Sequence, residues 1–146
     1  GTTSRGLGDV YKRQASVLNL KIKNLKRYNE LRIKQASHLI KATKTSNIET
    51  LRLTSDQFSV FHQFPILSTK RKSLMTHLKK NGINCGIYYP KPLSKMKAFS
   101  KKVLRNKVHS KNSEMACNQI LSLPIGPHLN IKDSEYIANA IQSFPK

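Results

Sequence analysis

Apolar side chains recur every three or four positions in the first part of the chain. Between Ala15 and about Ala42 these positions hold Leu18, Ile22, Leu25, Tyr28, Leu31 and Leu39. Gln35 is the one polar residue at such a position, and lysines and arginines fill the opposite face. Neither glycine nor proline occurs from Ala15 to Phe64. This spacing is typical of one face of an α-helix, so we predict an amphipathic helix of more than roughly 20 residues.

The pattern changes to a period of two between Ser59 and Leu67, which predicts a β-strand. The side chains that would share one face of this strand are Val60, His62, Phe64 and Ile66. Phe61 would point to the opposite face. Pro65 has no N–H to donate to a neighbouring strand, so we expect an edge position or a strand end there.

The helical period returns over Lys70–Lys80, where Leu74, Met75 and Leu78 are expected to point inward. Gly82 follows the last turn and is expected to adopt the left-handed conformation that ends many helices. Two prolines, Pro90 and Pro92, come after the apolar residues of the next short segment. We therefore predict a short strand over residues 85–89, stopped by a stiff, extended loop.

The rest of the chain alternates polar and helical segments. Residues 100–112 are polar and predict a surface loop, after which Ser113 is expected to cap a helix running to about Gln119. An extended segment follows, and Asp133 or Ser134 is expected to begin a last helix through Ile141. This order of elements contains no repeat and predicts a small α/β or α+β layer.

The first 14 residues differ from the rest, because they are rich in glycine and show no period. The hexapeptide DVYKRQ, Asp9–Gln14, resembles a translated transposon-end adapter of the kind used in library preparation. We expect residues 1–14 to be an artefactual or disordered leader outside the core, and the domain to cover residues 15–146. An ordinary flexible terminus is the alternative. On the adapter interpretation, the natural protein would begin upstream.

The charge of the chain raises a second class of function. Lysine and arginine number 27 against 7 aspartates and glutamates, a formal net charge of +20. A small basic nucleic-acid-binding module is therefore an alternative, and aromatic and basic residues interleaved on one sheet face would favour it. Cys85 and Cys117 lack metal-ligand spacing and are expected to be reduced thiols. No apolar run is long enough to predict a membrane span.

Four segments, taken in order, resemble the C-terminal small domain of the DegT/DnrJ/StrS family of nucleotide-sugar aminotransferases. The resemblance covers about residues 15–144. The first segment, ASVLNLKIKNLKRYNELR, is similar to the helix that links the two domains in the family. The other three are VFHQFPI with RKSLMTHLKKNGI, then GIYYPKPLSKMKAF, and finally SEMACNQILSLPIGPHLN.

The resemblance implies the fold and chemistry of an aspartate-aminotransferase-type, fold type I enzyme that uses pyridoxal 5'-phosphate. Such an enzyme transfers an amino group, typically from glutamate, to a nucleotide-linked keto-sugar for amino-sugar or surface-polysaccharide synthesis. Family members are typically cytoplasmic homodimers. The lysine that forms the Schiff base with the cofactor lies in the family's large domain. No catalytic or cofactor-binding role is therefore assigned to a lysine of this chain, and neither a membrane nor a specific nucleic acid is expected as a partner.

The resemblance also places the substrate-binding residues. In the family, the loop matching GIYYPKPLSKMKAF reaches the active-site mouth, so Tyr88, Tyr89 and Ser94 are expected to contact the sugar. Tyr88 and Ser94 stand where many relatives have histidine. The alternative is that the tyrosines pack on the surface of their own domain.

Outside this loop we expect mainly structural roles. His62 is expected to be a structural histidine, and His77 and His128 are expected to be ordinary surface residues. Arg71 is expected to begin its helix. Cys85 is expected to be a small buried residue rather than a nucleophile, because no basic partner is fixed beside it by sequence.

Overall fold

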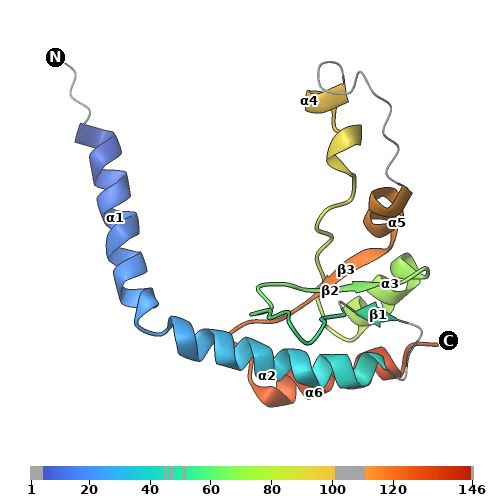
Figure 1. Cartoon of the computed structure of the whole chain (residues 1–146). Coiled ribbons are helices and arrows are strands. Elements are labelled where there is room, and N and C mark those ends of the chain that lie inside the picture. Colours follow the sequence, from blue (N-terminus) through green and yellow to red (C-terminus); the bar gives the residue numbers. More distant parts are fainter. Residues whose placement is uncertain (1–4, 45, 47, 51, 101–110, 146) are drawn as a thin grey trace.

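The computed structural model describes residues 5–44, 46, 48–50, 52–100 and 111–145 (Figure 1). Its helices are α1 Arg5–Ile22, α2 Leu25–Thr43, α3 Arg71–Lys80, α4 Lys97–Ser100, α5 Lys111–Gln119 and α6 Ile131–Gln142, with a 3₁₀ turn η1 at Leu93–Lys95. The strands are β1 Glu49–Thr50, β2 Phe64–Leu67 and β3 Ile120–Leu123, paired antiparallel in the order β1-β2-β3.

Two helices, α1 and α2, stand where one long helix was predicted. The chain bends at Lys23 and Asn24, and the N–H of Asn24 donates to the carbonyl of Lys21 at 3.0 Å. Helix α1 leads away from the rest of the molecule (Figure 1). Leu18, Ile22 and Leu25, which were predicted to lie on a buried face, are therefore each at least 50% exposed.

The predicted boundary after residue 14 is not the boundary of an element. Helix α1 begins at Arg5 and continues through this position to Ile22. The side chains of Tyr11, Lys12, Arg13 and Gln14 are exposed. Whether residues 1–14 derive from an adapter stays a prediction, and residues 1–4 lie outside the described part of the chain.

Helices α2 and α6 lie side by side and cover one face of the sheet (Figure 1). Leu39 is buried as predicted, and Ile137 and Ile141 of α6 pack in the same core. Helix α6 begins earlier than predicted because Asn130 caps it. The Asn130 side chain accepts from the N–H of Asp133 at 3.1 Å, and the Asp133 carboxylate accepts from the N–H of Asn130 at 2.7 Å.

The strand predicted over Ser59–Leu67 is confined to its last four residues, Phe64–Leu67. Phe61 has a φ of 49° and is buried, so the chain turns sharply before the strand begins. His62 is consequently exposed, and the prediction of a structural histidine was wrong. Phe61 has a left-handed backbone conformation, which interrupts the extended strand. The alternation of inward and outward side chains therefore does not continue through this residue.

Pro65 was predicted at a sheet edge or a strand end. The edge position was wrong, because β2 is the central strand, but Pro65 is the second residue of β2 and so lies near a strand end. Its partner in β3 is Ser122, but both the N–H and the carbonyl of Ser122 bond to Gly86 on the other side. Pro65 and Ser122 therefore form a non-hydrogen-bonded pair, and the Pro65 nitrogen faces the β1 side. The pairs that described residues form with β1 are Glu49 with Leu67 and Thr50 with Ile66, and neither uses the Pro65 nitrogen.

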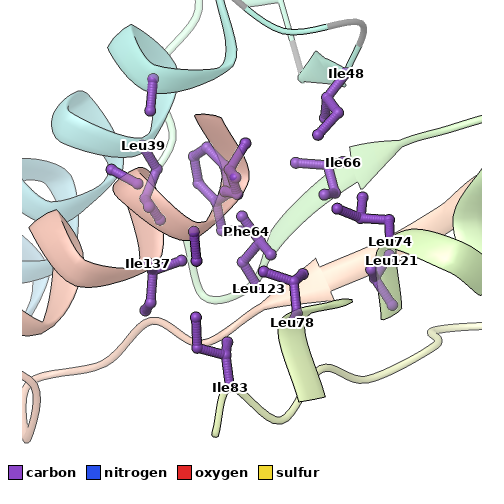
Figure 2. Packing of buried hydrophobic residues seen from close by; sticks show 14 of the residues in the cluster. Leu39, Ile48, Phe64, Ile66, Leu74, Leu78, Ile83, Leu121, Leu123 and Ile137 are labelled. Carbon is purple, nitrogen blue, oxygen red and sulfur yellow. The ribbon is translucent and has the colours of Figure 1, made fainter. Parts of the chain in front are cut away.

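The apolar core lies between the sheet and the three helices α2, α3 and α6. Figure 2 shows Phe64 between the strands and the helical side chains Leu39 and Ile137, and Leu121 beside Leu74 of α3. Leu74 and Leu78 of α3 are fully buried, as the helical spacing predicted. Each fully buried side chain of this size contributes about 1.5–3 kcal/mol to the free energy of unfolding.

Local sequence signals predicted the bounds of α3 more accurately than those of α5. Gly82 has a φ of 70° directly after α3, as predicted. Helix α5 begins at Lys111, so Ser113 lies inside the helix and is not its cap. Most of the loop predicted at residues 100–112, namely residues 101–110, lies outside the described residues.

Candidate functional site

The segment that follows Cys85 is attached to the sheet at one residue. Gly86 donates its N–H to the carbonyl of Ser122 at 3.1 Å and accepts from the N–H of Ser122 at 2.7 Å. The predicted strand over residues 85–89 is therefore a single bridge. Beyond it the prolines carry the chain away from the sheet, and η1 begins directly after Pro92.

Tyr88 and Tyr89 lie where the chain leaves the sheet. Tyr88 is 46% exposed and Tyr89 is 67% exposed. Their ring centroids are 6.0 Å apart at 71°, an edge-to-face arrangement that aromatic pairs favour. The Tyr88 ring lies against Gly86, because a Cβ built on this glycine would lie 2.5 Å from Tyr88 Cε2. The absence of a side chain at Gly86 thus gives the ring its place.

A groove brings together the three residues predicted from the sequence. Tyr88, Tyr89 and Ser94 line one side of a hollow of about 560 Å³, and Ser113 and Cys117 of α5 line the other. The remaining lining residues are Lys91, Pro92, Leu93, Ala116 and Ile120. We call this hollow the tyrosine groove. It combines aromatic and aliphatic walls with phenol and serine hydroxyls.

Two polar contacts fix the far wall of the tyrosine groove. Lys95 of η1 forms an ion pair with Glu114 of α5 at 2.8 Å. The Arg71 guanidinium, at the start of α3, donates from Nη1 to the carbonyl of Cys117 at 2.6 Å. Arg71 thus begins its helix as predicted, and it also ties α5 to α3. No local pattern in the sequence indicates this contact, which spans 46 positions.

A second hollow lies on the other side of Tyr88. It measures about 270 Å³, and its polar side chains belong to His62, Gln63, Asn84 and Ser122. The rest of its lining comes from Gly86, Tyr88, Leu123, Pro124 and Ile125. We call it the polar hollow. It shares one wall with the tyrosine groove, namely Tyr88.

Gln35 holds the loop behind the polar hollow. Its Nε2 donates to the carbonyls of Gly126 at 2.9 Å and Leu129 at 2.7 Å. Its Oε1 accepts from the N–H of Gly126 at 3.1 Å. This buried amide is well satisfied, which explains the polar residue in an otherwise apolar helical register.

The remaining residues singled out from the sequence are Cys85, His77 and His128, and none of them lines the tyrosine groove. Burial raises the pKa of the Cys85 thiol to about 11, so the thiol is protonated and a poor nucleophile at neutral pH. His77 is not an ordinary surface residue, because its Nε2 lies 2.8 Å from the carbonyl oxygen of Ala140 and its ring packs on Phe144. His128 is exposed, as predicted.

The residues that the structure describes do not fit a covalent pyridoxal-phosphate site. Every lysine whose side chain the structure describes is exposed to solvent, whereas a lysine that binds this cofactor covalently needs a desolvated pocket. The described residues also contain no group of three or more His, Cys, Asp or Glu placed to hold a metal ion. No helix within the described ranges has the length and apolar content of a membrane span.

Comparison with known proteins identifies the family. The DegT/DnrJ/EryC1/StrS aminotransferase family matches residues 10–142. The chain belongs to this family. It is 31% identical over 134 residues to the "pleiotropic regulatory protein" of Geobacillus stearothermophilus, across 90% of this chain and 36% of that protein. It is 27% identical over 131 residues to the dTDP-3-amino-3,6-dideoxy-alpha-D-galactopyranose transaminase of Aneurinibacillus thermoaerophilus, across 90% of this chain and 35% of that one.

Solved structures of this aminotransferase family confirm the predicted fold class. DesV of S. venezuelae, in complex with a ketimine intermediate, matches with a TM-score of 0.81 and 27% identity, over 88% of this chain and 35% of DesV. A family member from Brucella abortus matches with a TM-score of 0.77 and 30% identity, over 90% and 35%. The chain thus spans about a third of the length of the relatives it matches.

The nucleic-acid-binding alternative gains no support. The family that matches is an aminotransferase family, and several of the relatives that match are named transaminases. The three described strands contain neither lysine nor arginine, and their one aromatic residue, Phe64, is buried. An RNA-binding sheet needs exposed aromatic and basic side chains on one face.

Proposed function

We propose that this chain is the small domain of a pyridoxal-phosphate-dependent enzyme that transfers an amino group to a nucleotide-linked keto-sugar. Membership of the aminotransferase family supports the proposal. So do the names of relatives, which place dTDP or UDP on the sugar and in two cases an acetamido group. The amino donor would be glutamate, the enzyme a cytoplasmic homodimer, and the product an amino sugar for surface polysaccharide.

The tyrosine groove is the observation that connects the proposed function with particular residues of this chain. Tyr88 and Tyr89 lie just before Pro90, and Ser94 lies in η1. All three line the same hollow. Aromatic rings pack on the apolar faces of sugar rings, and phenol and serine hydroxyls donate to or accept from sugar oxygens. The neighbouring prolines reduce the conformational entropy lost on binding. The groove would therefore hold and orient the sugar.

The cofactor would be supplied by the rest of the enzyme. Pyridoxal phosphate, when bound, acts as the electron sink of the transfer. The exposed lysines of this chain are unsuited to hold it. The role of the described residues is then to position the sugar and to exclude water around it. The uncovered apolar side chains of α1 also support a larger enzyme, because such surfaces mark contacts with other protein.

Substitutions in the full-length enzyme test the groove. We expect Tyr89→Phe and Tyr88→Ala to lower kcat/KM for the keto-sugar roughly three- to tenfold, the effect of one lost hydrogen bond or ring contact. The absorbance of the bound cofactor should not change, because neither residue would contact it. Steady-state kinetics and an absorbance spectrum measure both quantities.

Tyr136→Phe is the matched control for this experiment. The Tyr136 hydroxyl donates to the carbonyl of Asn81 at 3.0 Å, and Tyr136 does not line the tyrosine groove. Loss of the Tyr136 hydroxyl in this variant should leave sugar turnover unchanged. Normal turnover by both groove variants would show that the tyrosines do not face the sugar.

A further inference from the structure

The polar hollow contains a buried hydroxyl without a hydrogen-bond partner. Ser122 is 5% exposed, and its Oγ has no partner among the residues that the structure describes. The backbone groups of Ser122 are already paired with Gly86. Leu121 and Leu123 point into the core, so the alternation of the strand turns the Ser122 side chain to the opposite face. Buried hydroxyls are normally paired, which points to a partner outside the described residues.

The other polar side chains of the hollow define the chemistry of that partner. His62, Gln63 and Asn84 can each donate or accept, and none of the lining residues is a carboxylate, an ammonium or a guanidinium. The ligand group should therefore be neutral and should carry donors and acceptors side by side. The volume of about 270 Å³ suits one small ring or substituent rather than a whole nucleotide sugar.

Apolar surfaces flank these polar groups. Tyr88 forms one wall, and Pro124 and Ile125 form another. A flat group can stack on an aromatic ring while its edge makes hydrogen bonds. The Tyr88 ring lies against Gly86, whose backbone pairs with Ser122, so the ring is next to the unpartnered hydroxyl. Exposed side chains change rotamer within nanoseconds, so this half-exposed ring can move when a ligand enters the hollow.

We propose that the polar hollow binds an amide edge, –CO–NH–, of the substrate, with Ser122 and Asn84 as its hydrogen-bond partners. This inference rests on the proposed function, because a nucleotide-linked sugar offers such an edge in two places. One is a pyrimidine base and the other is an acetamido substituent on the sugar. Tyr88, the wall shared with the tyrosine groove, would then separate this group from the reacting part of the sugar.

The test is an NMR titration of the 146-residue chain with three small probes. Uridine carries the amide edge of a base, N-acetylglucosamine carries that of an acetamido group, and glucose carries none. We expect uridine, N-acetylglucosamine or both to shift the backbone signals of Asn84 and Ser122, whereas glucose does not. A response to one probe alone identifies the source of the amide edge.

Two serine variants complete the test. Ser122→Ala should weaken binding of the responding probe about three- to tenfold, the effect of one lost hydrogen bond. It should not lower the melting temperature, because a hydroxyl without a partner in the protein contributes no stability. Ser73→Ala makes the same chemical change at an exposed position of α3 and should alter neither quantity.

Several results would overturn the inference. These are equal shifts with glucose, no shift with either amide probe, undiminished binding by Ser122→Ala, or a lower melting temperature of Ser122→Ala than of Ser73→Ala. The proposed function fails separately, through normal sugar turnover in the Tyr88 and Tyr89 variants. If the amide probes fail while those variants are impaired, only the assignment of the polar hollow is lost.

Discussion

Tyr88 owes its position to the missing side chain of Gly86. Three atoms of the phenol lie within 2.8 Å of the place where a Cβ would stand. They belong to the outer end of a side chain, so the ring would turn aside rather than push the backbone apart. Because Tyr88 is the wall between the tyrosine groove and the polar hollow, a change at Gly86 would alter both.

Gly86→Ala should therefore displace the Tyr88 ring at little cost in stability. We expect the ring signals of Tyr88 to shift in NMR spectra, with a loss of less than about 1 kcal/mol in the free energy of unfolding. Gly82→Ala is the matched control, because Gly82 has a φ of 70° and open space around it. That variant should lose about 1 kcal/mol and leave Tyr88 in place. Unchanged Tyr88 signals in Gly86→Ala would contradict this account.

The sequence predicted the residues of the tyrosine groove but not those of the polar hollow. Tyr88, Tyr89 and Ser94 stand close together in one motif, so their resemblance to the family was enough to select them. Ser122 is an ordinary residue in LSLP, and its significance depends on neighbours from two other segments, residues 62–63 and 84–88. These segments come together only in the folded chain, so the local sequence around Ser122 does not indicate that they will form a site.

At the scale of elements, Gln35 couples α2 to the loop that follows β3. Its three hydrogen bonds satisfy the N–H and carbonyl of Gly126 and the carbonyl of Leu129. The same loop begins with Pro124 and Ile125, which line the polar hollow. A side chain on the second helix thus holds one wall of a site formed about 90 positions later.

Gln35→Leu should destabilise the protein strongly. It leaves buried backbone groups of the loop unpaired, and we expect a loss of about 2–3 kcal/mol in the free energy of unfolding. Gln14→Leu makes the same substitution at an exposed position of α1 and should change this free energy by less than about 0.5 kcal/mol. Chemical denaturation measures both. Equal stability of the two variants would show that the Gln35 hydrogen bonds are dispensable.

Elements set by local signals were predicted better than those set by partners. Helix α3 and the turn at Gly82 follow from spacing and one glycine, and both were confirmed. Pro65 was expected at a sheet edge or a strand end, and the sequence does not show that strands lie on both sides of β2. The capping box of α6 was visible in the sequence as Asn130 and Asp133, and it was the signal that could have set the start of that helix.

At the scale of the whole molecule, α1 is amphipathic but lies apart from the core (Figure 1). Its apolar spacing predicts a buried face, yet Leu18, Leu20 and Ile22 are exposed. Periodicity reports that a face is apolar and does not report what covers it. The chain also spans only about a third of the relatives it matches. In the proposed enzyme, this chain would shape the substrate site and another part would hold the cofactor.

The most direct test of this account is the reaction of the 146-residue chain with pyridoxal phosphate. The chain is mixed with the cofactor, reduced with borohydride and mapped by mass spectrometry. Exposed lysines react weakly and without selection, so we predict scattered, substoichiometric modification and no transfer from glutamate. A single lysine modified stoichiometrically, together with turnover of glutamate, would contradict the assignment of this chain as a substrate-side domain.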